Sequence, residues 1–193
     1  MIFTPKQTHA LKTWIATASG LEGVFFRSVE RRYMDPDDVL SGEGAASKGG
    51  RFAAKGMRAV YLSATDSGAS KETTERKKRL GGGALINTAK YPRIVYAVAV
   101  KLDRVLRLDG LASSTEGDAI QELCLDEDDL AASMEVATMV EFAGIQGLVF
   151  PSVVKGGDDN LVVFCKNYAP NAVRIENEAD FIAETKKIAS KRK

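Results

Sequence analysis

The stretch SKGGRFAAKG, at residues 47–56, contains the residue types that commonly hold phosphate groups. Gly49 and Gly50 let the main chain approach a ligand closely and adopt positive φ angles. Arg51 offers a planar fork of N–H donors that matches phosphate oxygens. Together these residues suit an anionic ligand such as a pyrophosphate, although a GGR sequence also occurs in many ordinary surface turns.

Arg27 and Ser152 are the next candidates, because each lies in or beside an apolar run. Arg27 belongs to VFFRSV at 24–29, and an arginine among such neighbours is rarely left without a partner or a ligand. Ser152 ends the run GLVFPS at 147–152, where its hydroxyl could donate a hydrogen bond into a cleft. An ordinary cap at the end of a strand is the alternative for Ser152.

The carboxylate candidate is Glu72, which comes eleven positions after Tyr61 in the sequence. The stretch 67–80 predicts a helix with Ser67 as its N-cap, and an early position in such a helix can face a cleft at a sheet edge. On local composition alone, the charged run KETTERKKR favours a solvated helix face instead.

Residue counts and motifs argue against several familiar kinds of site. The chain has one histidine, His9, and nothing around it supports a Ser–His–Asp triad. Cys124 and Cys165 form no CxxC pair, so neither a zinc site nor any other metal site is expected. The glycines at 81–83 lack the lysine and serine of a P-loop. Any chemistry must therefore use carboxylates, arginines, hydroxyls and main-chain groups.

The composition is that of an ordinary globular protein. The chain has 193 residues, 45% hydrophobic and 27% charged, with a formal net charge of +1. This near-neutral balance favours neither nucleic acid nor an anionic membrane as a partner. The first 20 residues lack the long apolar region typical of a signal peptide, and no apolar run approaches the roughly 20 residues that span a bilayer. We therefore expect a single cytoplasmic domain without a membrane segment.

The elements that must position the candidate residues follow from hydrophobic periodicity and turn signals. Their order, with strands interrupted by helices and followed by a hairpin, predicts an α+β fold with a mixed or mainly antiparallel sheet. A long loop is expected over 35–56, around the GGR sequence. The expected helices are 5–18, 67–80, 116–144 with a break near Asp128 and Asp129, and 178–190, and the expected strands are 24–29, 59–64, 94–100, 104–109, 147–152 and 161–165, the last two as a hairpin.

Taken in order, these motifs resemble the RES domain family, which is named for arginine, glutamate and serine. The resemblance rests on FFRSV, then GGRF followed by Gly56, then VYLS with an acidic residue eleven positions after the tyrosine, then GLVFPS and NLVVF. It covers about residues 24–165 and implies one domain over 1–193, with an N-terminal and a C-terminal helix appended. The chain departs from the family at Phe52 and Ala53, where members usually have Trp and Asn.

The resemblance implies a role for each matching residue, an ADP-ribosyltransferase-like fold, and NAD as the substrate without a metal. The catalytic residues implied are Glu72, Arg51 and Ser152, and the NAD-binding residues implied are Arg27, Gly49, Gly50, Arg51, Tyr61 and Ser152.

Several members of the family are toxins that degrade NAD and are neutralised by antitoxins with an Xre-like helix-turn-helix region. The resemblance therefore implies an NAD glycohydrolase or NAD phosphorylase that cleaves the nicotinamide–ribose bond, paired with an Xre-like antitoxin. A protein-directed mono-ADP-ribosyltransferase and a non-catalytic module that binds a nucleotide or a protein are the alternatives. The acceptor, the antitoxin, the oligomeric state (a homo-oligomer included) and toxicity in the host stay open.

Overall fold

The computed structural model describes residues 2–70, 93–152 and 158–176, and confirms an α+β fold. Residues 66–70 are also helical, as are short 3-10 segments at Arg31–Tyr33 and Leu108–Ser113. The helices are α1 (Pro5–Ile15), α2 (Pro36–Val39), α3 (Glu43–Lys48), α5 (Thr115–Leu125) and α6 (Ala131–Phe142), and the strands are β1 (Ser19–Glu30), β2 (Ala59–Ser63), β3 (Arg93–Arg107), β4 (Gly147–Phe150), β5 (Asn160–Phe164) and β6 (Val173–Ile175).

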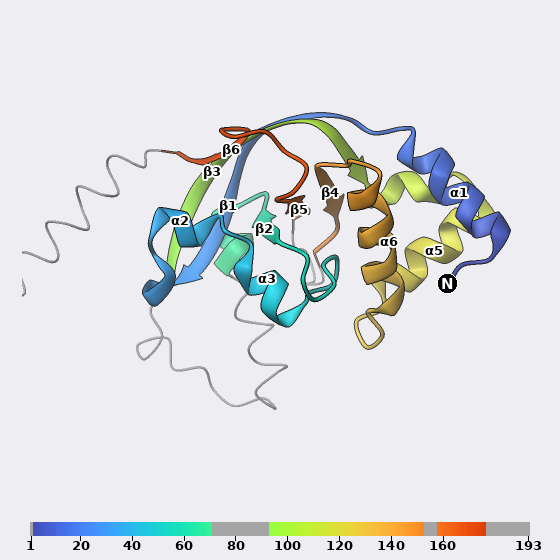
Figure 1. The fold of residues 1–193 in the computed structure, drawn as a ribbon, viewed down its shortest axis with the longest axis horizontal. Coiled ribbons are helices and arrows are strands. Elements are labelled where there is room, and N and C mark those ends of the chain that lie inside the picture. Colours follow the sequence, from blue (N-terminus) through green and yellow to red (C-terminus); the bar gives the residue numbers. More distant parts are fainter. Residues whose placement is uncertain (1, 71–92, 153–157, 177–193) are drawn as a thin grey trace, which may run out of the picture.

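The six strands form one mixed sheet that curls back on itself. Strands follow the order β1-β2-β5-β4-β3-β6, and β1 also pairs with β3, so that the first five strands form a closed circuit. All pairs are antiparallel except β3 with β4. The long strands β1 and β3 run side by side, with β6 on the other side of β3 (Figure 1). Strand β1 meets β2 at a single pair, Phe26 and Ser63.

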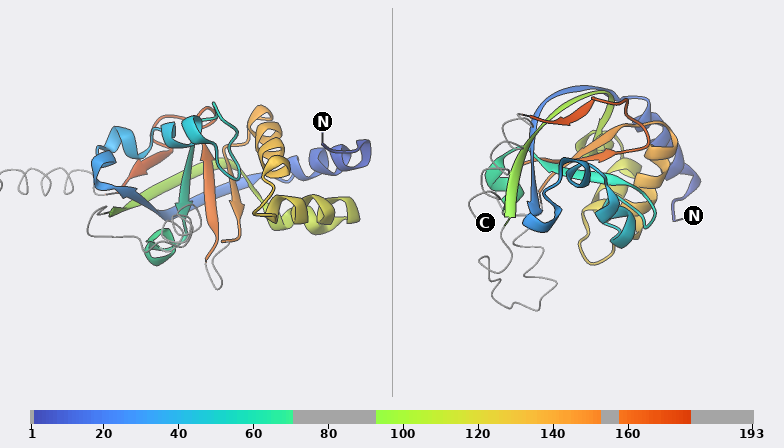
Figure 2. Two further views of the ribbon diagram at one scale, coloured as in Figure 1. Left: turned by 90° about the horizontal axis from the view of Figure 1, so that it is seen from below. Right: turned by 60° about the vertical axis from the view of Figure 1, so that its left-hand side comes forward.

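The two faces of β2, β4 and β5 belong to different cores, because alternate residues of a strand point to opposite faces. The inner core lies between the strands, and the outer core lies between the sheet and helices α1, α5 and α6, which gather at one end of the molecule (Figure 2). From β2, Val60 and Leu62 enter the inner core, whereas Tyr61 packs against the outer core.

The structure confirms most of the expected elements and corrects four details. The hairpin of β4 and β5 is present, and α5 and α6 are separated by a turn at 126–130. The stretches 94–100 and 104–109 were predicted as two strands but belong to β3, because the sheet continues through the exposed residues between them. The loop expected over 35–56 contains α2 and α3, and β6 was not predicted.

The fourth correction concerns the N-cap predicted at Ser67. Thr65 is the cap, because its Oγ1 accepts a hydrogen bond from the Gly68 N–H at 3.0 Å. The predicted helix 178–190 and the remainder of 67–80 beyond residue 70 lie outside the described residues. In the part of the chain that is described, no helix has the length and apolar character needed to cross a bilayer.

Candidate functional site

The GGR sequence forms a tight turn directly after α3. Gly49 ends that helix with φ 74° and ψ 175°, a conformation that side chains disfavour. The Gly50 N–H donates to the Ala53 carbonyl at 2.8 Å, and the Ala53 N–H donates back to Gly50 at 3.3 Å. Main-chain bonds therefore order this turn, although the chain has Ala53 where the family usually has Asn.

Tyr61 holds the turn against the sheet. Its hydroxyl accepts a hydrogen bond from the Phe52 N–H at 3.0 Å. A Cβ added to Gly50 would lie 2.6 Å from the same hydroxyl, so the close approach requires glycine. The Tyr61 ring meets the Phe150 ring edge-on, at 6.4 Å between centroids, and Phe52 lies 4.7 Å from Phe150. Phe52 is fully buried and anchors the turn in the outer core.

Arg51 lies against the end of α5. Its side chain is 12% exposed, and its Nη2 lies 3.7 Å from Oε1 of Glu127, in the turn that follows that helix. Cys124, near the end of the same helix, is close enough for the charge to act on it. Burial raises the pKa of the Cys124 thiol to about 12, and the Arg51 charge opposes that shift. The guanidinium group of Arg51 therefore lies at the C-terminal end of α5, beside the glycine turn.

Arg27 approaches Tyr61 from the opposite face of the sheet. Its neighbours on alternate positions of β1, Phe25 and Val29, pack in the inner core. Its Nη1 donates to the main-chain carbonyl of Tyr61 at 3.1 Å, while its Nε is buried without a hydrogen-bond partner. Desolvation by burial lowers the pKa of Arg27 to about 10, and the charge of Arg93 acts in the same direction.

The charge on Arg27 is not balanced by a carboxylate among the described residues. The Cys165 thiol and the Tyr168 phenol could balance it only when ionised, and burial raises the pKa of both, so that they are neutral at neutral pH. A buried cation with such neighbours and an unused donor suits an anionic ligand.

Ser152 lies two residues beyond Phe150, at the end of β4, and is half-buried. Glu72 lies outside the described residues, in the stretch that follows the helical residues 66–70. The structure thus places Gly49, Gly50 and Arg51 in one turn, and Tyr61 contacts that turn at Gly50 and Phe52. Tyr61 also packs on Phe150, in the strand that leads to Ser152. Arg27 touches these residues only through the Tyr61 carbonyl.

Sequence reasoning missed three residues that shape this region: Phe150, Glu127 and Cys124. Phe150 was visible within GLVFPS, but only the fold shows that its ring supports Tyr61. Nothing in the local sequence connects Cys124 or Glu127 with Arg51, because more than 70 residues separate them in the chain. Within the described ranges, no three His, Cys, Asp or Glu side chains are grouped so as to hold a metal ion.

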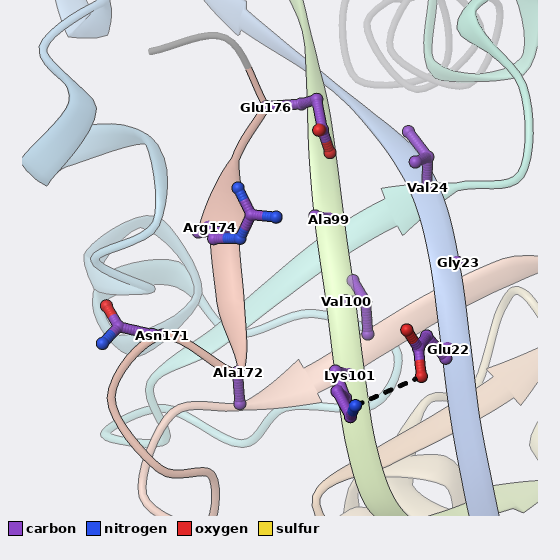
Figure 3. A pocket seen from close by; sticks show the side chains of 10 residues that line it. All are labelled: Glu22, Gly23, Val24, Ala99, Val100, Lys101, Asn171, Ala172, Arg174 and Glu176. Atoms are coloured by element: carbon purple, nitrogen blue, oxygen red, sulfur yellow. Dashed lines mark ion pairs between the residues drawn. The ribbon is translucent and has the colours of Figure 1, made fainter. Parts of the chain in front are cut away.

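Two surface hollows lie away from these residues. One, of about 310 Å³, is on the outside of β1, β3 and β6, where Lys101 pairs with Glu22 at 3.6 Å and Arg174 lies nearby (Figure 3). The other, of about 550 Å³, lies between α1 and the start of α5 and includes His9. Neither is lined by the candidate phosphate-binding or catalytic residues.

Comparisons with known proteins identify both a family and a fold. The model of the RES domain matches residues 24–184. A chain in the crystal structure of the M. tuberculosis MbcT–MbcA toxin–antitoxin complex is similar in structure, with a TM-score of 0.71 and 18% sequence identity. That similarity covers 90% of this chain and 91% of the other. No protein with a curated description matches this sequence.

Proposed function

The chain belongs to the RES domain family, and we propose that it cleaves the nicotinamide–ribose bond of NAD as the toxin of a toxin–antitoxin pair. One observation carries the proposal furthest. Arg27 is a buried cation with an unused N–H donor and no carboxylate counterion in the described structure. A ligand that brings its own negative charge would supply the missing partner, and the pyrophosphate of NAD has that property.

Arg51 supports the same assignment. The N–H groups of Gly49, Gly50 and Ala53 are hydrogen-bonded within the protein, so the turn is ordered and holds the Arg51 side chain in place. We propose that Arg51 and Arg27 both contribute to binding the phosphates of NAD, with Gly49 and Gly50 giving close access to the main chain. The Arg51–Glu127 contact, at 3.7 Å, is an ion pair that is longer than a hydrogen bond.

The reaction itself places few demands on proton transfer. The nicotinamide ring carries a positive charge in NAD and departs as a neutral molecule, so the leaving group needs no general acid. The barrier lies in forming an oxocarbenium-like ribosyl cation, as in glycoside cleavage. A carboxylate near the ribose stabilises that cation. We assign this role to Glu72, which also orients the acceptor.

Tyr61 and Ser152 complete the proposed site. The Tyr61 hydroxyl accepts a hydrogen bond from the Phe52 N–H, and we propose that the tyrosine ring serves as a wall of the nicotinamide pocket. Ser152, at the end of β4, would hydrogen-bond the ribose or the carboxamide of nicotinamide. This scheme uses no histidine and no metal, and NAD enters as a substrate.

The molecule that accepts the ADP-ribosyl group determines which reaction is catalysed. Water makes the protein an NAD glycohydrolase, and inorganic phosphate makes it an NAD phosphorylase. We propose one of these two, acting in the cytoplasm, rather than transfer to a protein side chain. The partner proposed is an Xre-like antitoxin. The structural similarity to a chain from a toxin–antitoxin complex supports a toxin role, since the fold extends over nine-tenths of both chains.

The experiment that tests this function is a product analysis. Purified protein is incubated with NAD, with and without inorganic phosphate, and nicotinamide and the ribose product are identified. Nicotinamide with ADP-ribose indicates the glycohydrolase, and a phosphate-dependent phosphorylated ADP-ribose indicates the phosphorylase. No nicotinamide release from folded protein, free of any bound antitoxin, would contradict the proposal and favour a transferase with a protein acceptor or a non-catalytic module.

A further inference from the structure

Three successive cross-links join the end of β2 to the start of β5. The Ser63 hydroxyl donates to Asn160 Oδ1 at 2.7 Å, and both side chains are buried. The Ala64 N–H donates to the carbonyl of Asp159 at 3.0 Å. The Thr65 hydroxyl donates to Asp158 Oδ2 at 2.7 Å. The paired strands end at Ser63 and Asn160, but these bonds continue the connection by two further residues.

Thr65 is also the N-cap of the helical residues that follow. Its Oγ1 accepts a hydrogen bond from the Gly68 N–H at 3.0 Å, and its carbonyl accepts one from the Ala69 N–H at 3.1 Å. A hydroxyl has one proton to donate and two lone pairs to accept with. Thr65 gives that proton to Asp158 and uses a lone pair for Gly68, so a single side chain joins the helix start to β5.

The packing around this junction is close. Gly68 is buried, and a Cβ added to it would lie 3.0 Å from Thr65 Oγ1 and 3.4 Å from the Ser63 side chain. The negative charge of Asp158 lies at the helix N-terminus, where it is favoured by the exposed N–H groups of the first turn. The Thr65–Asp158 bond therefore joins the first turn of the helical residues 66–70 to the residues that precede β5.

Two residues of the proposed reaction centre, Glu72 and Ser152, are near the two joined segments in the sequence or in the sheet. Glu72 follows Asp66 by six residues. Ser152 ends β4, which pairs along its length with β5. We propose that Thr65 and Asp158 are positioning residues: they fix the helical residues 66–70, which precede Glu72 in the sequence, relative to the paired strands β4 and β5, of which β4 precedes Ser152. This inference rests on the proposed NAD cleavage, and it assigns no substrate contact to either residue.

Two pairs of variants test the inference. Thr65→Val keeps the shape of the side chain but removes the hydroxyl, and Thr65→Ser restores it. Asp158→Ala removes the acceptor of the Thr65 hydrogen bond, and Asp159→Ala is its control. Asp159 forms a 2.8 Å ion pair with Arg107, in which the two side chains are 44% and 56% exposed. The control variant therefore removes a neighbouring carboxylate from the same segment without touching the Thr65 side chain.

Each variant is assayed for nicotinamide release over a range of NAD concentrations, and its Tm is measured. We expect Thr65→Val and Asp158→Ala to lower kcat by at least roughly tenfold, because a small displacement of reacting groups has effects of this order. KM should stay within about twofold of wild type, since neither residue contacts the phosphate-binding arginines. Thr65→Ser and Asp159→Ala should retain the wild-type kcat. A purely structural role would lower Tm without this separation of kcat from KM.

The inference is overturned if wild type cleaves NAD while folded Asp158→Ala and Thr65→Val keep its kcat. It is also overturned if Asp159→Ala lowers kcat as much as Asp158→Ala, or if Thr65→Ser is as slow as Thr65→Val. Should Thr65→Val fail to fold, the Asp158 and Asp159 pair decides. If folded wild-type protein releases no nicotinamide, the proposed function fails first and this inference fails with it.

Discussion

The Tyr61 hydroxyl occupies the space that a side chain at residue 50 would need, only 2.6 Å from an ideal Cβ built on Gly50. The same hydroxyl accepts the Phe52 N–H. Tyr61 therefore both requires glycine at position 50 and orders the turn that carries Arg51. The tyrosine and the glycines of the family motif thus form one unit, although they come from different parts of the sequence.

This relationship makes Gly50→Ala a specific test. The added methyl group should displace the turn and raise the KM for NAD, because Arg51 moves with it. Tyr61→Phe in the same chain removes the closest atom, although the ring carbon Cζ would still lie 3.1 Å from the Cβ. We therefore expect the KM of the double variant to lie between the high value of Gly50→Ala and the value of the Tyr61→Phe single variant. Strict additivity of the two effects, measured by steady-state kinetics, would contradict a direct contact.

Arg51→Ala should act mainly on substrate binding. Loss of charge-assisted hydrogen bonds to phosphate costs about 1.5–3 kcal/mol, which corresponds to a KM for NAD raised roughly tenfold to a hundredfold. Arg104→Ala is the matched control, because Arg104 is exposed and bonds only to main-chain and side-chain groups near the end of α6. An unchanged KM in Arg51→Ala, or an equal rise in Arg104→Ala, would remove Arg51 from the phosphate site.

Arg27→Met should separate stability from function. Burial of an arginine without a counterion is unfavourable, and replacing buried charges by apolar side chains of similar volume is often neutral or stabilising. We expect the Tm of the ligand-free variant to be no lower than that of wild type, while the KM for NAD rises. A large fall in Tm with an unchanged KM would mean that Arg27 serves only to hold the Tyr61 carbonyl.

Cys124 gives a prediction for alkaline pH. Burial raises the pKa of its thiol from 9.0 to about 12, so between these values the unfolded chain releases a proton that the folded protein retains. The contribution of this thiol to stability is therefore complete below pH 9 and is lost as the pH rises toward 12. Urea unfolding should show a shallower decline above pH 9 in Cys124→Ala than in wild type. Parallel declines would show that the thiol does not titrate in this way.

The elements that carry the candidate residues could be predicted because each is a strongly apolar run with clear boundaries. VFFRSV, AVYLS and NLVVF all became strands with the expected residues inside them. Strand β3 was divided in the prediction because Lys101 and Asp103 resemble a turn, yet the sheet passes through them as exposed positions. Helices α2 and α3 were hidden within a segment rich in Asp, Ser and Gly, since such short helices depend on tertiary packing rather than on propensity.

The sequence indicated which residues belong to the candidate site better than it indicated how they are arranged. Family spacing selected Arg27, Arg51 and Tyr61, but only the fold shows that Arg27 bonds to the Tyr61 carbonyl while the Tyr61 ring packs against the outer core. The contact between Arg51 and Glu127 requires α5 to pack beside the glycine turn. Such long-range relationships depend on the closure of the sheet, which no local pattern encodes.

The Glu72 carboxylate is proposed to stabilise the ribosyl cation that forms when NAD is cleaved, and a comparison of three proteins tests this role. Nicotinamide release is compared among wild type, Glu72→Gln and the control Glu75→Gln, all purified, folded and free of antitoxin. We expect release by wild type and by Glu75→Gln, and a loss of kcat of at least roughly a hundredfold in Glu72→Gln, because the amide cannot stabilise the ribosyl cation. Equal release by Glu72→Gln and wild type, or no release by wild type, would contradict it.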